Sequence, residues 1–287
     1  MYQKIILGTA QFGMKYGISN KIGKIKTKNI FKILKFLKKK KIKFLDTASQ
    51  YKTSENEIGK FYKKTNIKFS VITKYILSDK ISIRKQLDKT YKNIGYYPDI
   101  ILAHNYKDYV SKKYQLEIKK IKELYPIKNF GVSLYNPNEL FKVLKVCKPD
   151  VIQVPCNILD KRFLDKKILK IIKKNSIKIH ARSIFLQGLL FKDFKFIRRK
   201  FKNVNKIFKS LQNQALKEKM NIGDLSLIWI FKQKEIDKII FGVDCLLHLQ
   251  NNIKTIKKKL SKETFEIIEQ NKLHNNKIIK PYLWKIK

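Results

Sequence analysis

Four residues of this chain have side chains that could together move a proton: an acid, a phenol, an amine and an imidazole. They are Asp46, Tyr51, Lys74 and His104. Each one ends a short apolar run or follows it closely, in the segments KFLDTASQY, FSVITK and DIILAH. No single helix or loop can gather residues this far apart, whereas a parallel barrel brings the carboxyl ends of its strands to one rim. The spacing therefore predicts a proton-transfer site at the rim of a barrel.

Tyr51 is the candidate acid of this set, although an unperturbed phenol, with a pKa of about 10, is a weak acid at neutral pH. A nearby ammonium stabilises the phenolate and lowers that pKa, and Lys74 is placed to do so. Asp46 could balance the charge of Lys74, and His104 could hydrogen-bond a substrate carbonyl beside the phenol. Such a site would polarise a C=O group and protonate its oxygen. None of the four is a good hydride source, so a cofactor would have to supply one.

Eight short apolar runs are candidates for the strands that position these residues. They lack clean alternation, as expected for strands buried on both faces. Lys-rich amphipathic segments separate them at spacings typical of βαβ units. Eight such periods favour an α/β fold, a single-domain (β/α)8 TIM barrel over residues 1–287, rather than a doubly wound sheet. The predicted strands are 4–8, 42–46, 68–74, 99–104, 127–133, 150–154, 177–182 and 237–242.

The segments between the strands carry helix signals. In 136–147, Asn136 is a candidate N-cap that is followed by Pro137 and Glu139, a well-formed helix start. In 223–234, Asp224 is the candidate N-cap. The interval before the last strand is long, and it predicts a helical insertion around 189–220. Further predicted helices are 28–41, 81–95, which ends at Gly95, and 262–273.

The formal charge of +44 raises the question of nucleic-acid binding. Only five of the 66 basic residues are Arg, although Arg is the better reader of phosphates and bases. The lysines also lie on nearly every helical segment rather than on one face. Lys, Ile and Asn, all abundant here, share A/T-rich codons. We therefore interpret the charge as a solvated Lys-rich surface shaped by genome composition, with no specific nucleic-acid partner.

The remaining composition favours a cytoplasmic protein. The three cysteines are scattered, without a CxxC pair or a His at ligand spacing, so no metal site is predicted. No apolar run approaches the roughly 20 residues of a membrane span. The N-terminal segment lacks the h-region and cleavage site of a secretory signal. We expect no membrane partner, and a monomer or small homo-oligomer.

The segments around these four residues resemble those of a known family, the aldo-keto reductases. LGTAQFG (7–13) resembles the family's first-strand LGxxxxG, and FLDTASQYKTSENEIG (44–59) resembles its DTAxxYxxSExxIG signature. VITK (71–74) and ILAH (101–104) follow in the family's order. The resemblance implies that Tyr51 is the general acid/base, that Lys74 and Asp46 tune it, and that His104 orients the carbonyl. Four further segments extend the resemblance to about residue 255: NFGVSLYNPNEL, IQVPCNILDKRF, ARSIFLQGLL and IIFGVDCLLHLQNNI.

The resemblance also implies a nicotinamide cofactor and its contacts. Ser133 and Gln153 match positions that hydrogen-bond the carboxamide, and Ser183 matches a position near the pyrophosphate. Gly242 and Val243 begin the loop that cradles the adenosine phosphate side. The later adenine-side contacts match Gln250 and Asn252. Barrels commonly bind phosphate near the loops after strands seven and eight, and no GxGxxG supports a Rossmann alternative.

Three residues depart from the family pattern. Leu134 stands where many members have Asn, so one amide contact is lost. Arg182 stands where many members have an aromatic residue that stacks on the nicotinamide, although a guanidinium plane can also stack. Asp244 stands where NADP-preferring members often have a base, and a carboxylate there would repel a 2′-phosphate. The family as a whole favours NADP(H), and NAD(H) stays open.

The expected activity is the interconversion of a carbonyl, in an aldehyde, ketone or keto-sugar, and an alcohol, with Tyr51 as general acid/base. The ILGTAQFGMKYGISN opening resembles a bacterial branch linked to sugars, so a hexose or keto-sugar is the leading substrate class. Two alternatives remain at this stage. One is a nucleotide-binding redox sensor on the same fold with little turnover. The other is a Lys-rich protein that binds polyanions or nucleic acid.

Overall fold

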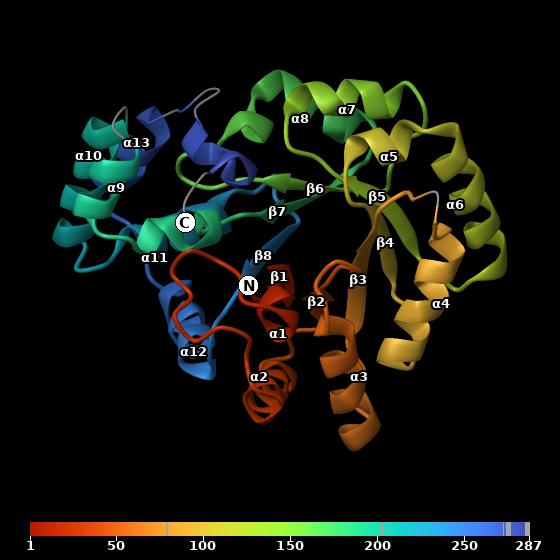
Figure 1. Cartoon of the computed structure of the whole chain (residues 1–287). Helices are drawn as coiled ribbons and strands as arrows, with labels where there is room; N and C mark the ends of the chain where they lie inside the picture. The colour runs from red at the N-terminus through yellow and green to blue at the C-terminus, as the bar shows by residue number, and fades with distance from the viewer. Residues whose placement is uncertain (79, 202–203, 272, 274–276, 285–287) are drawn as a thin grey trace.

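Eight parallel strands close into a barrel in chain order, each paired with the next and the last with the first. The computed structural model describes residues 1–78, 80–201, 204–271, 273 and 277–284. The predicted (β/α)8 architecture and its eight strands are confirmed (Figure 1). The strands are β1 Ile5–Gly8, β2 Phe44–Asp46, β3 Ser70–Tyr75, β4 Ile100–Ala103, β5 Asn129–Ser133, β6 Val151–Pro155, β7 Lys178–Arg182 and β8 Lys238–Gly242.

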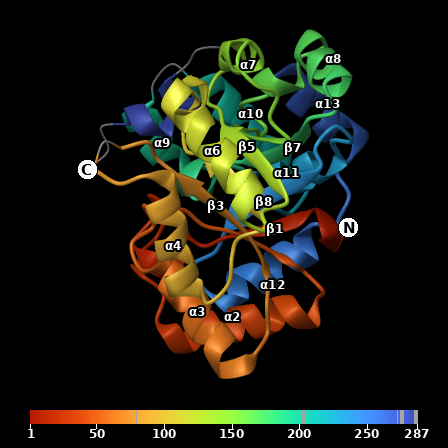
Figure 2. The same ribbon diagram turned by 90° about the vertical axis from the view of Figure 1, so that its right-hand side faces the viewer.

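Helices cover the outside of this barrel. Figure 2 shows α2, α3 and α12 on one side of the strands and α7 and α8 on the other. The helices are α1 Ala10–Gly13, α2 Thr27–Lys39, α3 Ser54–Thr65, α4 Ile83–Ile94, α5 Tyr106–Val110, α6 Lys112–Leu124, α7 Pro137–Leu144, α8 Lys166–Lys174, α9 Phe194–Lys200, α10 Asn205–Lys217, α11 Ile222–Lys232, α12 Leu246–Thr255 and α13 Lys262–Gln270. Short 3₁₀ turns are η1 Tyr2–Lys4, η2 Arg162–Leu164, η3 Leu186–Phe191, η5 Lys277–Ile279 and η6 Pro281–Leu283.

The helix ends follow local capping chemistry. Helix α7 begins with the predicted capping box of Asn136 and Glu139, and α4 ends at Gly95, whose φ of 92° suits glycine. The prediction of Asp224 as the N-cap of α11 is wrong, because Asn221 caps that helix. The side chain of Asn221 accepts from the backbone N–H of Asp224, and the Asp224 carboxylate accepts from the backbone of Asn221. Two capping residues three positions apart thus form one reciprocal box.

The long connection between β7 and β8 holds η3, α9, α10 and α11. Helices α9 and α10 lie within the expected insertion at 189–220, of which 202–203 fall outside the described residues. Helix α10 packs against α9 and α13, and the three lie together beside the barrel (Figure 1). This part of the chain adds a helical layer without interrupting the ring of strands.

Two apolar cores result from the alternation of side chains along the strands. The larger core lies between the strands and the helices, and includes the buried stripe of α2. The smaller core fills the inside of the barrel. Its members are Ile6, Ile72, Ile100, Leu102, Val151 and Ile240, which we call the barrel floor. Lys74 follows Ile72 by two positions on β3, and Gln153 follows Val151 by two positions on β6. Each polar residue therefore lies on the same strand face as its apolar partner, at the barrel mouth.

The described residues contain neither a membrane-spanning helix nor a cluster of metal ligands. No described helix combines the length and the apolar character needed to cross a membrane. The described His, Cys, Asp and Glu residues form no group of three or more that could hold a metal ion.

Candidate active site

Lys74 and Asp46 form a buried ion pair at the barrel mouth. The Lys74 ammonium donates to Asp46 Oδ1 at 2.6 Å and to the Thr47 carbonyl oxygen at 2.7 Å. The other carboxylate oxygen, Oδ2, accepts from Gln153 Nε2 at 2.7 Å. Lys74 is 2% exposed and Asp46 is 3% exposed. The contacts tie together the ends of β2, β3 and β6, so the charged groups have fixed positions.

Burial lowers the pKa of the Lys74 ammonium, and the negative charge of Asp46 opposes that shift. Removing an ion from water is costly unless its charge is matched and its hydrogen bonds are satisfied. Asp46 supplies the charge, while the Thr47 carbonyl accepts a second N–H. The same bonds that position the Lys74 ammonium thus offset part of the cost of its burial.

Tyr51 lies in the turn between β2 and α3, next to this pair. The Lys74 Nζ atom is 5.3 Å from the centre of the Tyr51 ring. Burial raises the pKa of Tyr51 above its ordinary value, the charge of Asp46 adds to the rise, and the charge of Arg182 opposes it. The predicted lowering of this pKa is therefore wrong for this structure, because burial of the phenol is the largest influence on it and acts in the opposite direction. The phenol stays protonated at neutral pH, the state required of a proton donor.

His104 follows β4 and lies at the same mouth. Its Nδ1 is 3.2 Å from Oε1 of Gln50. Burial lowers the pKa of His104 to about 4, with the charges of Lys74 and Arg182 adding to the shift. The ring is therefore neutral near pH 7, with one N–H donor. As placed, Nδ1 donates to Gln50, and a half-turn of the Gln50 amide would leave Nε2–H free to donate to a carbonyl.

The backbone around Tyr51 is fixed by close packing with the segment 9–14, which follows β1 and includes the short helix α1. We call this segment the first loop. A Cβ atom on Gly13 would lie 1.8 Å from the Tyr51 carbonyl oxygen and 2.6 Å from the Ser54 nitrogen. Glycine is therefore required here for close approach of two backbones. The buried Ser54 hydroxyl donates to the Thr9 carbonyl oxygen at 2.9 Å, which fixes the start of α3. The first loop and α3 together hold the turn that presents Tyr51.

Glu55 anchors the same helix from its other side. The Thr73 and Thr90 hydroxyls each donate to Oε1 of Glu55 at 3.0 Å, and Asn93 Nδ2 donates to Oε2 at 3.2 Å. Burial raises the pKa of this carboxyl, and the hydrogen bonds oppose the rise. The Glu55 side chain thus joins α3 to β3 and α4. The helix that follows Tyr51 is attached at both its backbone and its buried side chains.

We expect Gly13→Ala to lower turnover by about 10²-fold, because a displacement of about 1 Å at a reacting group has that effect. The added methyl group would meet backbone atoms that cannot move without shifting Tyr51. Gly8→Ala is the matched control, since its Cβ meets only ordinary contacts at 3.5 Å. Steady-state kinetics and the urea midpoint of both variants give the measurement. Equal turnover in the two variants would contradict this role for Gly13.

The predicted cofactor residues of β5, β6 and β7 lie at the same mouth. Arg182 Nε donates to the Ser133 hydroxyl at 3.3 Å, and its Nη1 donates to the Ser183 hydroxyl at 3.2 Å. Gln153 uses its Nε2 on Asp46, and no described residue donates to its Oε1. Gln153 therefore keeps an acceptor for an amide N–H, and the Ser133 hydroxyl keeps a proton to donate. This donor and acceptor set fits a carboxamide such as that of nicotinamide.

The predicted residues of the last loop lie around the end of β8. A Cβ atom on Gly242 would lie 2.5 Å from Oε1 of Gln11, so this backbone is covered by the first loop. Val243 is buried. Burial raises the pKa of the Asp244 carboxyl, and His248 Nδ1 lies 4.0 Å from its Oδ2. Gln250 and Asn252 lie on α12, and no side-chain hydrogen bond in the described part of the chain joins them to the mouth.

Three site residues were not singled out in the sequence. The ring of Tyr16 lies 6.5 Å from that of Tyr51, centre to centre, and burial raises the pKa of Tyr16 to about 12. Tyr135 lies under the Arg182 guanidinium at 4.3 Å, and Gln50 contacts His104. All three lie in rim loops or next to a predicted residue. Their identity as Tyr or Gln alone gives no signal, since such residues are common in turns and packing.

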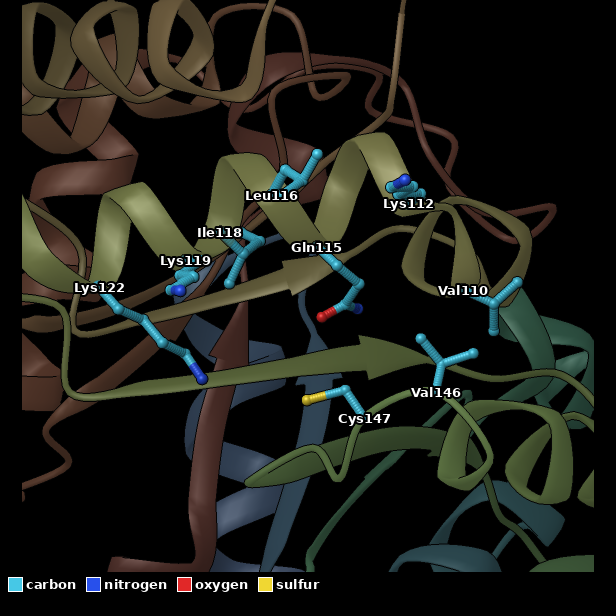
Figure 3. A pocket seen from close by; sticks show the side chains of 9 residues that line it. All are labelled: Val110, Lys112, Gln115, Leu116, Ile118, Lys119, Lys122, Val146 and Cys147. Carbon is cyan, nitrogen blue, oxygen red and sulfur yellow. The ribbon is translucent and has the colours of Figure 1, made fainter.

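Two hollows on the helical surface do not contain these residues. Figure 3 shows a groove of about 540 Å³ between α6 and the end of α7, lined by Leu116, Val146 and Cys147 among others. A second hollow, of about 970 Å³, lies against α7 and α8 and includes Arg162 and Glu139. Neither is lined by any of the four predicted catalytic residues. The candidate active site is therefore identified by the side chains at the barrel mouth and not by the size of a hollow.

Comparisons with known proteins agree with the fold. A sequence model of the Aldo/keto reductase family matches residues 4–272. A search of curated proteins gives no significant match. Similar solved structures include the holo form of the aldo-keto reductase AKR11C1 from Bacillus halodurans, with 16% identity, a TM-score of 0.73, and coverage of 93% of this chain and 91% of that one.

Two further solved structures are similar over nearly their whole length. The aldo-keto reductase from Klebsiella pneumoniae in complex with NADPH has 15% identity and a TM-score of 0.70, with 93% of this chain and 90% of that chain covered. The thermostable aldo-keto reductase Tm1743, in complex with the inhibitor epalrestat, has 20% identity and a TM-score of 0.70, with 93% and 94% covered. At these identities the likeness shows the shared fold.

Proposed function

Because this chain belongs to the aldo/keto reductase family, we propose that it is an NAD(P)-dependent oxidoreductase that interconverts a carbonyl and an alcohol. The observation that supports this most directly is the buried Lys74–Asp46 pair beside the protonated Tyr51. A phenol, a fixed cation and a neutral imidazole at one mouth form a set that can bind a carbonyl oxygen and protonate it.

In the proposed mechanism, Tyr51 protonates the carbonyl oxygen in the reducing direction and accepts the proton back in the oxidising one. Lys74 and Asp46 fix the electrostatic surroundings of the phenol, and His104 orients the oxygen through its ring N–H. Ser133 and Gln153 would hold the cofactor by its carboxamide. The cofactor, when bound, supplies or accepts the hydride. The isoleucine-rich barrel floor excludes water from below this layer.

For the cofactor we propose NADP(H), with NAD(H) as the alternative. The NADPH complex of the Klebsiella pneumoniae protein favours the first. Asp244 favours the second, because a carboxylate repels a 2′-phosphate and can accept a ribose hydroxyl. Ser183, Gly242, Val243, Gln250 and Asn252 are the proposed contacts toward the phosphates and adenine. For the substrate we propose an aldehyde, ketone or keto-sugar, with a hexose as the leading class.

Binding of the nucleotide tests this proposal. We expect micromolar NADPH, or NADH, to quench the intrinsic Tyr and Trp fluorescence of the protein, and a panel of carbonyls and sugars to reveal turnover with the bound nucleotide. The Asp244→Asn variant should gain affinity for NADPH relative to NADH by about tenfold, since one opposing charge is removed. Absence of binding of either nucleotide would exclude the proposed function. Tight binding without turnover on any panel member would favour the redox-sensor alternative.

A further inference from the structure

Arg182 is a cation at the barrel mouth that forms no ion pair with any described carboxylate. Its guanidinium donates to the Ser133 and Ser183 hydroxyls, and its Nη2 donates to the Leu134 carbonyl oxygen at 3.0 Å. No carboxylate of the described residues lies within 4.0 Å of it. Arg162, by contrast, pairs with the buried Asp160 at 2.8 Å. The charge of Arg182 is thus held in place but not neutralised.

The position of Arg182 faces the proton-transfer residues across the mouth. Arg182 ends β7, whereas Lys74 lies on β3, four strands away around the ring of eight. Burial is the main influence on the pKa of both Tyr51 and His104; the charge of Arg182 opposes the rise at Tyr51 and adds to the lowering at His104, in keeping with its place across the same mouth. The face of the guanidinium lies on Tyr135, and its edges are bonded. The group therefore has little freedom to turn away from a ligand between the two sides.

A nicotinamide ring that reacts at this site must lie between these two sides. Hydride transfer requires the reacting atoms to approach within about 3–3.5 Å, and Tyr51 and His104 fix the carbonyl oxygen at β2–β4. The ring then lies toward β5–β7, where Gln153 keeps a free acceptor and Arg182 keeps its charge. This placement rests on the proposed function.

We propose that Arg182 makes the site select the reduced, uncharged nicotinamide over the oxidised, cationic one. The two forms of the cofactor differ in charge only at this ring. A fixed cation nearby disfavours the positively charged ring and leaves the neutral ring unaffected. An aromatic side chain at residue 182 would act in the opposite sense, because an aromatic face attracts a cation. The ratio of the two dissociation constants therefore reports directly on Arg182.

We expect the dissociation constant of NADP⁺ to exceed that of NADPH by about tenfold or more, because like charges a few ångströms apart repel strongly in a partly buried site. For a two-electron couple, a tenfold ratio corresponds to a shift of about 30 mV in the potential of the bound cofactor. The dissociation constant of NAD⁺ should likewise exceed that of NADH, since the adenosine side is common to both members of each pair. Selection of the reduced form is thus independent of the choice between NADP(H) and NAD(H).

Isothermal titration calorimetry on the full chain tests the inference without catalysis. The four nucleotides are titrated into the wild type, Arg182→Gln, Arg182→Lys and Arg84→Gln. Arg182→Gln should lower the ratio of oxidised to reduced dissociation constants by about tenfold, and Arg182→Lys should preserve it, because only the charge matters. Arg84→Gln is the matched control, because Arg84 is exposed on the helical layer, in α4, and this variant removes an equal charge there.

The outcomes separate this inference from the proposed function. Equal affinities for oxidised and reduced forms in the wild type, or a ratio that Arg182→Gln leaves unchanged, would overturn the role of Arg182 while the function stands. Absence of binding of all four nucleotides would overturn both. If Arg182→Gln does not fold, Arg182→Met is the second neutral variant, and it should lower the ratio to the same extent; an unchanged ratio in Arg182→Met would overturn the role of Arg182.

Discussion

Tyr51→Phe is expected to lower turnover by about 10²–10⁴-fold, the usual contribution of general acid catalysis, and to leave nucleotide affinity nearly unchanged. The substitution removes one hydroxyl from a ring whose backbone is held by Gly13 and Ser54, so the fold of the turn is retained. The kinetics are measured with NADPH and with NADH on the best substrate of the panel, and the affinity is measured by calorimetry.

The matched control for this variant is Tyr16→Phe. Tyr16 offers a second phenol in a comparable setting, with its ring 6.5 Å from that of Tyr51 and its pKa raised to about 12 by burial. No hydrogen bond or ring contact joins it to Lys74 among the described residues, and we expect its loss to change turnover by less than about tenfold, below the usual range for an acid. A large loss in Tyr16→Phe together with retained turnover in Tyr51→Phe would mean that Tyr16 is the acid.

Lys74→Met should be the most destabilising single change at the site. It leaves the Asp46 carboxylate buried without its cation, and breaking a buried pair by removing one partner costs about 3–5 kcal/mol. Turnover should also fall by on the order of 10²-fold or more, since the electrostatic setting of Tyr51 is lost. Urea unfolding of the purified variant gives the free energy of unfolding, and steady-state kinetics give the turnover.

The double variant Asp46→Asn/Lys74→Met separates the two effects. Removing both charges should recover much of the stability, because no unpaired ion remains, while turnover stays low. Lys128→Met is the surface control: Lys128 also pairs at 2.6 Å, with Asp99, but its side chain is 70% exposed. Its loss should cost less than about 1 kcal/mol. A Lys74→Met variant that is no less stable than Lys128→Met would contradict the view that the Lys74 pair is buried and interdependent.

The strands and the four residues at their ends could be predicted from the sequence because barrel geometry converts strand order into position. Lys74, at the end of one apolar run, and Asp46, at the end of another, had to meet once the strands were parallel and adjacent. Helix starts were predictable where one capping residue was present, as at Asn136. The start of α11 was not predictable, because two nearby residues, Asn221 and Asp224, each have a side chain that can cap a helix.

The parts that could not be predicted depend on contacts between distant loops. The need for glycine at residue 13 comes from the backbone of Tyr51, which approaches it only after folding. The raised pKa of Tyr51 also escaped prediction, since it comes mainly from burial of the phenol, which depends on the packing of the folded chain. Arg182 was recognised as a departure, but its lack of a carboxylate partner is visible only in three dimensions.

The barrel floor separates two electrostatic environments within one molecule. Outside, the surface lysines face water and salt, where charges more than about 10 Å apart are largely screened. Inside, isoleucine and valine side chains surround the layer that holds Asp46, Lys74 and Gln153, and interactions there are screened much less. The interactions among Asp46, Lys74 and Gln153 should therefore depend little on salt or on the charges of the surface. Under the proposed function, the strongly cationic exterior can change in composition while the layer at the barrel mouth keeps its electrostatic balance.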